Sequence, residues 1–551
     1  MDFYPRKAQF LPGEPIALHL ETEGISAEEV QITVYRLQHQ VARLHVPFKN
    51  GKAEVTLPPV CEPFAGYGVE ASISKGKGEE VICTTAFDVS RPDRVIRYGF
   101  LSDFSPDDKG EEDIRFMARC HLNTVQFYDW SYRHDDLVAP LEQYADMMGK
   151  HNDLSCVRQK VEACKAWGMR PLAYGAIYAA SRAFWEQHTA WGFYAARNQP
   201  IRFIDVFYLM NIAKGCPWRE HILAQYRRAM ADVGFDGIHM DTYGFPKAAL
   251  DDAGNTVYLD EEFPSLISDA KISLSSNGAS PCLIFNNVGG WPAEKTQSAP
   301  QAAVYIEVWP PYERYCHLKQ LILDAKRAGK PVILAAYMSP FRLDTPQRAL
   351  EAYLCASFVI AVCGATHLCL GEKSGMLTQG YYADYSRLTP WQEEKIFAYQ
   401  DFFVRYQELL YDDSLADVSA SHMGGDNIEY RCDAPCSPWG EPGKLYLTLR
   451  QNKQKKTIAL LNLCGETDDL WSLGKQPPLP QKQISLRILV ERPVVNVWFA
   501  TPDADFGRAV QLPYAIELTG NGTMLSVCIP SLVRCGLLWM EMEVPEASDI
   551  V

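Results

Sequence analysis

The chain of 551 residues lacks any apolar run long enough to cross a bilayer, which takes about 20 residues. Its most apolar stretch, 354–365, is shorter than that and contains Ser357. The segment from Met1 to Lys7 has no apolar core of the kind found in secretory signals. These absences predict a cytoplasmic protein with no membrane partner, or a secreted one if a leader has been removed.

Positive charge is also in short supply. The 53 lysines and arginines are outnumbered by 68 aspartates and glutamates, which gives a formal net charge of -15. A protein that binds nucleic acid needs a basic surface to neutralise phosphates, so we expect no nucleic-acid partner. Aromatic residues reach 12%. Sugar-binding clefts use such rings for stacking, although a large core accounts for them equally well.

Paired cysteines and metal-ligand clusters are missing as well. The 16 cysteines are scattered singly, as is typical of reduced, buried thiols. The one close pair, Cys432 and Cys436, has no further Cys or His at zinc spacing. We therefore expect no structural metal and no cofactor.

The first 94 residues alternate apolar and polar side chains over short runs. Examples are 16–20, 30–35 and 53–57, and turn signals such as Asn50-Gly51 separate them. This spacing predicts an immunoglobulin-like β-sandwich over residues 1–94.

From residue 95 the pattern changes to alternating strands and helices. Helical stretches fall between most of the strands, and several end at a glycine, as helix C-termini prefer. The eight candidate strands are 95–104, 124–130, 171–178, 237–243, 282–288, 303–309, 331–338 and 366–372. We predict a catalytic (β/α)8 barrel over residues 95–415. The alternative is a doubly wound open sheet, but the stretch after the first strand, 103–107, is not the glycine-rich turn that such a fold uses.

Period-two alternation returns after residue 415. Candidate strands are 444–449, 457–463, 484–490, 494–499 and 523–529, which predicts a C-terminal antiparallel β-sandwich over 416–551. The fold class is thus a multidomain α/β plus all-β protein with a central barrel.

Two of the barrel strands carry an acid late on their inward-facing side. In 237–243 the apolar residues Ile238 and Met240 alternate with His239 and Asp241, and in 303–309 the same pattern leads to Glu307. Active sites of such barrels lie at the C-terminal ends of the strands. We therefore expect Asp241 and Glu307 to meet in one cavity, unless both are neutralised by basic partners in the core.

Two carboxyl groups in one cleft suit glycoside chemistry, in which one attacks the sugar and the other moves the proton. Asp241 is the better candidate nucleophile, because it is short and follows a strand end, with donors expected around Thr242 and Tyr243. Glu307 is the candidate acid/base, because its apolar neighbours should raise its pKa.

Further polar and aromatic residues are expected at the same mouth. They would bind sugar hydroxyls or stack on sugar rings; a loop salt bridge at 129–133 and an ordinary turn at 286–287 are the alternatives. The candidate substrate-binding residues are Tyr128, Asp129, Trp130, His134, Tyr178, Tyr243, Asn286, Trp309, Glu372 and Tyr381.

Taken together, these segments resemble glycoside hydrolase family 66, which contains dextranases and cycloisomaltooligosaccharide glucanotransferases. The resemblance extends over most of the chain and rests on Gln126-Phe127-Tyr128-Asp129-Trp130, Gly237-Ile238-His239-Met240-Asp241-Thr242, Phe285-Asn286, Tyr305-Ile306-Glu307-Val308-Trp309 and the segment 371–382. It implies retaining cleavage of α-1,6-glucosidic bonds, with Asp241 as nucleophile and Glu307 as acid/base.

The chain departs from this family in having no stretch between strands long enough for the carbohydrate-binding module that the glucanotransferases carry. We therefore expect a compact hydrolase of dextran or isomalto-oligosaccharides. The alternatives are a transglycosylase that makes larger or cyclic products and a carbohydrate-binding protein without catalysis.

Overall fold

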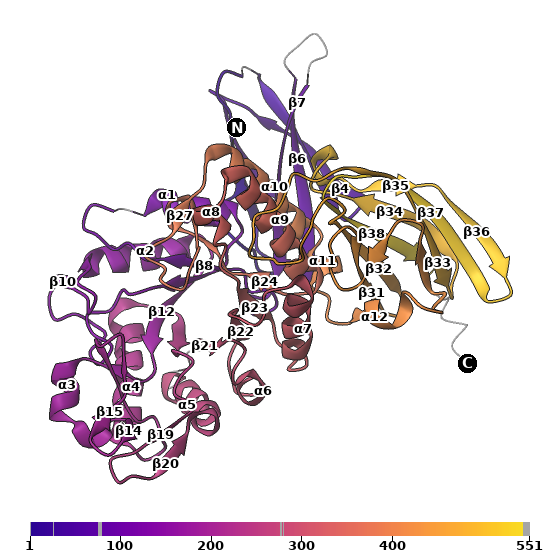
Figure 1. Ribbon diagram of the computed structural model, residues 1–551. Helices are drawn as coiled ribbons and strands as arrows, with labels where there is room; N and C mark the ends of the chain where they lie inside the picture. The colour runs from indigo at the N-terminus through magenta and orange to yellow at the C-terminus, as the bar shows by residue number, and fades with distance from the viewer. Residues whose placement is uncertain are drawn as a thin grey trace.

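The computed structural model describes residues 2–25, 27–74, 80–108, 110–275, 278 and 280–543. Figure 1 shows a mixed α/β molecule in which sheets from the two ends of the chain flank a helix-rich centre. The predicted mixed class, with strands at both ends and alternating strands and helices between them, is confirmed.

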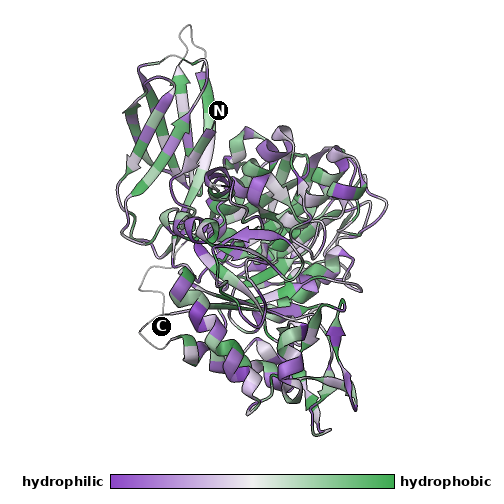
Figure 2. Ribbon diagram, turned by 90° about the vertical axis from the view of Figure 1, so that its left-hand side faces the viewer, coloured by the Kyte–Doolittle hydropathy of each residue, from purple (hydrophilic) through white to green (hydrophobic). Residues whose placement is uncertain are grey.

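The N-terminal strands form two antiparallel sheets around one apolar core. The alternation of hydrophobic and hydrophilic residues along their strands is visible in Figure 2. One sheet has the order β1-β2-β5 and the other β4-β3-β6-β7. Their bounds are Asp2–Pro5, Ile16–Glu21, Glu29–Arg36, His39–Pro47, Lys52–Leu57, Phe64–Ser74 and Glu80–Ser90, for β1 to β7 in turn.

A curled, eleven-stranded sheet occupies the centre, and its core pairs are all parallel. The parallel strands, in spatial order, are β8 (Tyr98–Leu101), β9 (Thr124–Phe127), β12 (Arg170–Ala176), β18 (Gly237–Asp241), β21 (Cys282–Val288), β22 (Ala303–Glu307), β23 (Val332–Ala335) and β24 (Thr366–His367). Seven of the eight fall within the predicted segments, β12 begins one residue before its segment, and most are shorter than predicted.

The two ends of this sheet meet at one short segment. β24 pairs with β23, while β25 (Leu370–Gly371), which follows after two residues, pairs in parallel with β8. β25 then continues antiparallel into β26 (Gly375–Met376) and β27 (Ser386–Arg387). Residues 366–371 therefore join the first strand to the seventh, and all eight parallel strands point their C-terminal ends the same way.

Helices lie between successive central strands and after the last of them. The main ones are α1 (Glu111–Arg119), α2 (Leu154–Ala166), α4 (Pro217–Arg228), α5 (Leu259–Leu274), α6 (Ala293–Thr296), α7 (Tyr315–Lys326), α8 (Pro340–Leu343), α9 (Pro346–Val362), α10 (Pro390–Arg405) and α11 (Gln407–Leu410). α9 is buried from Ala349 to Val362, which explains its apolar sequence. No helix among the residues described here is long and apolar enough to span a membrane.

The junction between α4 and β18 positions the first candidate acid. A π-helical turn, 229–233, ends at Gly234, whose φ of +97° lies in the left-handed region that glycine adopts without strain. At Gly237 a Cβ would come within 1.8 Å of the Cys282 carbonyl oxygen. Only glycine lets β18 approach β21 this closely.

A small lobe of short strands projects from the loops after β12 and β18 (Figure 1). It contains β13 (Ala179–Ala180), α3 (Arg182–Gln187), β14 (Tyr194–Ala196), β15 (Gln199–Pro200), β16 (Arg202–Phe203), β17 (Phe207–Leu209), β19 (Ala248–Leu250) and β20 (Thr256–Tyr258). β10 (Gln143–Ala145) and β11 (His151–Asp153) form a separate hairpin after β9.

The C-terminal strands form a seven-stranded and a four-stranded sheet around a third core. Their elements are β28 (Ala416–Asp417), α12 (Ser419–His422), β29 (Tyr430–Cys432), β30 (Cys436–Ser437), β31 (Leu445–Gln451), β32 (Lys455–Asn462), β33 (Gln481–Val490), β34 (Val494–Ala500), β35 (Val510–Leu512), β36 (Tyr514–Thr519), β37 (Gly522–Leu532) and β38 (Cys535–Met542). The last part of the predicted segment 416–551, residues 544–551, lies outside the described residues. The domain boundaries at 94 and 415 stay predictions.

Candidate active site

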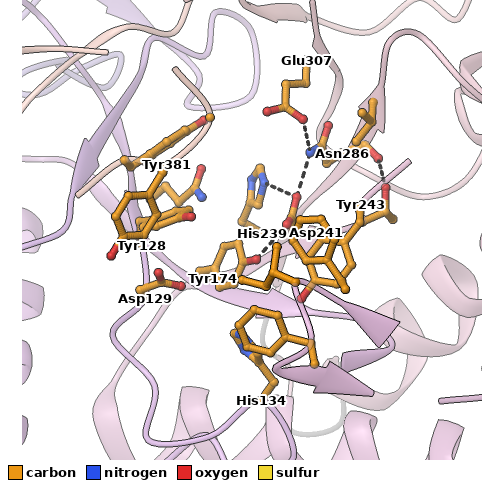
Figure 3. A pocket seen from close by; sticks show the side chains of 18 of the residues that line it. Tyr128, Asp129, His134, Tyr174, His239, Asp241, Tyr243, Asn286, Glu307 and Tyr381 are labelled. Carbon is orange, nitrogen blue, oxygen red and sulfur yellow. Dashed lines mark hydrogen bonds and ion pairs between the residues drawn. The ribbon is translucent and has the colours of Figure 1, made fainter. Parts of the chain in front are cut away.

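Three neighbouring strands bring Asp241, Asn286 and Glu307 to one place. Asp241 is the last residue of β18 and Glu307 the last of β22, and β21 with Asn286 lies between these strands. Figure 3 shows the Asn286 side chain between the two acids. Its Nδ2 donates to Asp241 Oδ1 at 2.7 Å and to Glu307 Oε2 at 3.2 Å.

One nitrogen that serves both carboxyl groups limits how far apart they can be. The two hydrogen-bond lengths, 2.7 Å and 3.2 Å, cap the separation of these two oxygens at about 5.9 Å. The predicted meeting of the two acids is therefore found in the structure. Neither acid has an Arg or Lys ion-pair partner among the described residues, so the alternative of neutralisation in the core does not apply.

Asp241 accepts a second hydrogen bond, from the Tyr174 hydroxyl to Oδ2 at 2.8 Å. Tyr174 lies on β12, where it pairs in register with His239. The amide of Thr242 also donates to Asp241, as expected. The amide of Tyr243 does not, because it donates to the Tyr178 hydroxyl at 2.6 Å.

Glu307 is held by a different set of donors. The Tyr337 hydroxyl lies 2.6 Å from Glu307 Oε1, and the Trp309 side chain donates as well. Tyr337 follows the end of β23, the strand beside β22. The two acids thus share Asn286 as a donor, and each also accepts a hydrogen bond from one tyrosine that does not contact the other acid.

Burial raises the pKa of both carboxyl groups. Desolvation, together with the charge of Glu307, raises the pKa of Asp241 to about 7. The hydrogen bonds from Asn286 and Tyr174 lower this pKa but do not cancel the rise. Desolvation also raises the pKa of Glu307, against hydrogen bonds from Tyr337, Trp309 and Asn286. The nearby His239 is neutral, because burial lowers its pKa to about 3. The pair therefore keeps one proton near neutral pH.

A cavity of about 420 Å³ opens above the two acids. Its wall is mainly aromatic, with polar groups between the rings. The lining residues include Gln126, Tyr128, Asp129, His134, Tyr174, Phe203, Ile204, Phe207, His239, Tyr243, Asn286, Tyr305, Trp309, Tyr337, Gly380, Tyr381 and Tyr382.

Four buried polar atoms in this wall have no hydrogen-bond partner among the described residues. They are Gln126 Oε1, His134 Nδ1, Tyr243 Oη and Asn286 Oδ1. Buried polar atoms are costly to leave unpaired, and most native proteins satisfy them.

Six of the predicted substrate-binding residues join Asn286 in the cavity wall. Tyr128 stacks on Tyr382 with ring centroids 4.7 Å apart. Burial raises the pKa of Asp129 to about 7. Tyr381 and Trp309 stand at the rim and are 38% and 39% exposed. His134 and Tyr243 complete the set, and the positions of several are visible in Figure 3.

Three predicted residues do not line the cavity, and we correct their assignment. The Trp130 ring is fully buried and donates to the Tyr174 carbonyl oxygen. The Tyr178 hydroxyl donates to the Phe245 carbonyl oxygen. Glu372 is fully buried and accepts hydrogen bonds from Ser102 and the Asp103 amide. In each case the strand ends before the predicted residue. The alternation of inward- and outward-facing side chains therefore stops before it reaches Trp130, Tyr178 or Glu372.

Several site residues were not among the predicted ones. Tyr337 continues the inward alternation of Ile333 and Ala335 just past β23, so the period-two pattern contained a signal for it. Phe203 and Phe207 come from the β16–β17 hairpin, for which the sequence gave no comparable pattern. At Gly380 a Cβ would lie 3.2 Å from Glu307 Oε1, so this glycine keeps the space beside that oxygen open.

Among the described residues, no group of three or more His, Cys, Asp or Glu side chains is arranged to hold a metal ion. The groups that the cavity presents are the two carboxyl groups and their tyrosine, tryptophan and asparagine donors.

Comparisons with known proteins agree with this geometry. A family model described as glycosyl hydrolase family 66 matches residues 5–535. A cycloisomaltooligosaccharide glucanotransferase of Niallia circulans is 22% identical over 703 residues, covering 98% of this chain and 72% of that protein. A dextranase of Streptococcus salivarius is 22% identical over 570 residues, covering 86% of this chain and 67% of that protein.

A solved structure shows the same fold. The crystal structure of a Paenibacillus sp. cycloisomaltooligosaccharide glucanotransferase complexed with cycloisomaltoheptaose superposes with a TM-score of 0.88 at 21% identity, covering 98% of this chain and 99% of that one.

Proposed function

The chain belongs to glycosyl hydrolase family 66, and from this premise we propose that it cleaves α-1,6-glucosidic bonds of dextran or isomalto-oligosaccharides by a retaining double displacement. Asp241 is the nucleophile and Glu307 the acid/base. The substrate class is supported by the relatives, which are named as dextranase and cycloisomaltooligosaccharide glucanotransferase.

The observation that carries the mechanism is the Asn286 amide shared by both acids. Retaining glycosidases have carboxyl groups about 5–5.5 Å apart, whereas inverting ones leave about 6.5–9.5 Å for a water molecule. The cap of about 5.9 Å set by the two hydrogen bonds favours direct attack by one carboxylate.

The hydrogen bonds favour placing the shared proton on Glu307. Among the described residues, the Tyr174 hydroxyl bonds only to Asp241, so it acts as a donor to a carboxylate. The Tyr337 hydroxyl has a second acceptor, the Tyr382 oxygen at 3.4 Å, so it can accept a hydrogen bond from protonated Glu307 and still donate one to Tyr382. Asp241 then attacks the anomeric carbon while Glu307 protonates the leaving oxygen.

The wall of the cavity is suited to a sugar. Tyr128 and Trp309 offer ring faces, and polar lining residues such as Asp129 and Asn286 suit a ligand rich in hydroxyl groups. A volume of about 420 Å³ accommodates a small number of sugar rings, within the range of ligand pockets.

Transglycosylation is the second candidate function, and it is supported by the partly exposed aromatic rings at the rim of the cavity. Trp309 presents a partly exposed ring beside Glu307, and Tyr381 presents another next to Tyr128, where an acceptor sugar could stack in competition with water. Gly380 leaves the same side unobstructed.

We also infer that the curled sheet is a (β/α)8 barrel and that the sheets at the two ends of the chain are β-sandwiches. The inference is supported by eight parallel strands, by the helices between them, and by the pairing of residues 366–371 with both sheet ends. A cytoplasmic location stays a prediction.

The test is cleavage of isomaltotriose, longer isomalto-oligosaccharides and dextran, with products separated by chromatography. We expect Asp241→Asn and Glu307→Gln to lower kcat/KM by about three orders of magnitude or more without unfolding the protein. NMR of the first product should show the α-anomer. Larger or cyclic products at high substrate concentration would favour transglycosylation. Near-native rates in either variant would refute the roles assigned to these acids.

A further inference from the structure

Behind Glu307 lies a row of three buried tyrosine hydroxyls. Tyr337 contacts Glu307 at 2.6 Å and Tyr382 at 3.4 Å, and Tyr382 contacts Tyr305 at 3.0 Å. The three residues are between 1% and 6% exposed and come from β22, the end of β23 and the loop after β26. The hydroxyls therefore form one hydrogen-bonded line that starts at the candidate acid/base.

An acid/base must be stable in two protonation states within one reaction cycle. It donates a proton when the glycosyl-enzyme forms and takes one from water when that intermediate is hydrolysed. A neighbour that can only donate, such as an ammonium group or a backbone N–H, stabilises the carboxylate alone. A hydroxyl can donate to the carboxylate and accept from the acid, provided that its own hydrogen then has another acceptor.

The row of tyrosines meets this condition. When Glu307 is ionised, Tyr337 donates to it, and in the Tyr382–Tyr305 pair either hydroxyl can donate to the other. When Glu307 is protonated, its hydrogen bond with Tyr337 reverses, Tyr337 donates to Tyr382, and Tyr382 donates to Tyr305, whose hydrogen turns toward the cavity that this residue lines. Each hydroxyl keeps its own proton and only rotates.

Two further features are consistent with this reversal. Burial raises the pKa of all three tyrosines, so they remain hydroxyls throughout the working range of the enzyme. The partner of the other acid differs, because Tyr174 is a single hydroxyl with no hydrogen-bonded hydroxyl behind it among the described residues. The row of three hydroxyls lies behind Glu307, the carboxyl group that must change state.

We propose that Tyr337, backed by Tyr382 and Tyr305, is the positioning residue that allows Glu307 to alternate between acid and base, through a hydrogen bond whose direction reverses with each proton transfer. The proposal rests on the proposed role of Glu307 and goes beyond it, since it assigns a function to three residues that do not themselves bond to the sugar carbon or carry the transferred proton.

The two tyrosines nearest Glu307 should shift its pKa in opposite directions. Tyr337→Phe removes a donor to the carboxylate, so the pKa of Glu307 should rise. Tyr382→Phe leaves Tyr337 with no protein acceptor except Glu307. Because Tyr337 then has to donate to Glu307, the ionised form of Glu307 is favoured over the protonated form, and the pKa of Glu307 should fall. We expect each shift to be about one pH unit, a tenfold change in the proton equilibrium.

The measurement is a carbon-13 NMR titration of the Glu307 carboxyl carbon, assigned by the loss of its signal in Glu307→Gln. The same variants are assayed for kcat/KM against pH on isomaltotriose, whose alkaline limb should move with the titration. Tyr226→Phe is the matched control, because its buried hydroxyl bonds to the Gly175 carbonyl oxygen away from the cavity. Thermal unfolding shows whether each variant folds.

Shifts in the same direction, or shifts smaller than about 0.3 unit in both variants, would overturn the proposal. Because the titration needs no substrate, it separates this proposal from the proposed function. Opposite shifts in a protein that cleaves no α-1,6-glucan would support the hydroxyl row and refute the substrate. Cleavage of α-1,6-glucan without opposite shifts would support the proposed substrate and refute the hydroxyl row.

Discussion

At the scale of single residues, the burial of Asp241 opposes folding. Its side chain is 14% exposed, and its pKa rises from 3.8 to about 7 because burial and the Glu307 charge disfavour the carboxylate. Between about pH 4 and pH 7 the folded protein therefore binds a proton that the unfolded chain has lost. The contribution of this group to stability falls as the pH rises through that window.

We predict that Asp241→Asn stabilises the protein by about 2–4 kcal/mol at pH 7 and by little at pH 4, because the amide carries no charge to bury. Urea unfolding of both proteins at the two pH values measures the difference.

Asp251→Asn provides a control of opposite sign. Slight desolvation of Asp251 is outweighed by hydrogen bonds from Asn255, so its pKa is lowered and the substitution should reduce stability at pH 7. A stability gain for Asp241→Asn that is equal at both pH values would contradict the prediction.

At the scale of elements, the β16–β17 hairpin forms one wall of the cavity at some conformational cost. Phe203 stacks on Tyr243 with centroids 4.2 Å apart. The turn that follows has φ of +44° at Ile204 and +58° at Asp205, a region that favours glycine and is unfavourable for a β-branched residue. The hairpin thus keeps a strained turn where it meets the cavity.

Asp205→Gly should relieve part of this strain. Only its exposed ion pair with Arg202, at 3.4 Å, is lost, and such pairs contribute little. We expect the free energy of unfolding to increase by about 1 kcal/mol, with kcat/KM unchanged. Asp205→Ala keeps a Cβ in the strained position and should show no gain. Equal stability changes in the two variants would remove strain as the explanation.

The limits of sequence-based prediction also follow from the elements. Asp241 and Glu307 were located because the alternation in 237–241 and 303–307 continues to the last residue of each strand. Trp130 was misassigned because β9 ends at Phe127 and Asp129 has a φ of +49°, which breaks the alternation. The shared amide of Asn286 depends on the register between β21 and its neighbours, which no pattern within one strand contains.

At the scale of the whole molecule, Glu70 connects three parts of the chain. It lies on β6, is 3% exposed, and accepts hydrogen bonds at 2.7 Å and 2.6 Å from Arg508 of the C-terminal region. Arg405 of α10 lies 3.8 Å from it. β6 is pressed against α10, since a Cβ at Gly66 would come within 2.1 Å of the Val404 carbonyl oxygen.

Replacing Glu70 by Gln would leave two arginines without their buried acid. We predict a loss of about 3–5 kcal/mol in the free energy of unfolding, with little change in kcat at 25 °C, because the site lies elsewhere. Thermal and urea unfolding measure the loss. Glu29→Gln, which removes an exposed pair with His45, should change stability by less than about 0.5 kcal/mol. Similar losses of stability in both variants would show that Glu70 does not hold β6, α10 and the C-terminal region together.

The pairing of residues 366–371 with both ends of the central sheet has a consequence for biosynthesis. On the ribosome, β8 is made early but cannot find its second neighbour until β25 has emerged some 270 residues later. Until then the sheet stays open and the pocket around Asp241 and Glu307 is unfinished. A nascent chain therefore completes this pocket only after residues 366–371 have been synthesised.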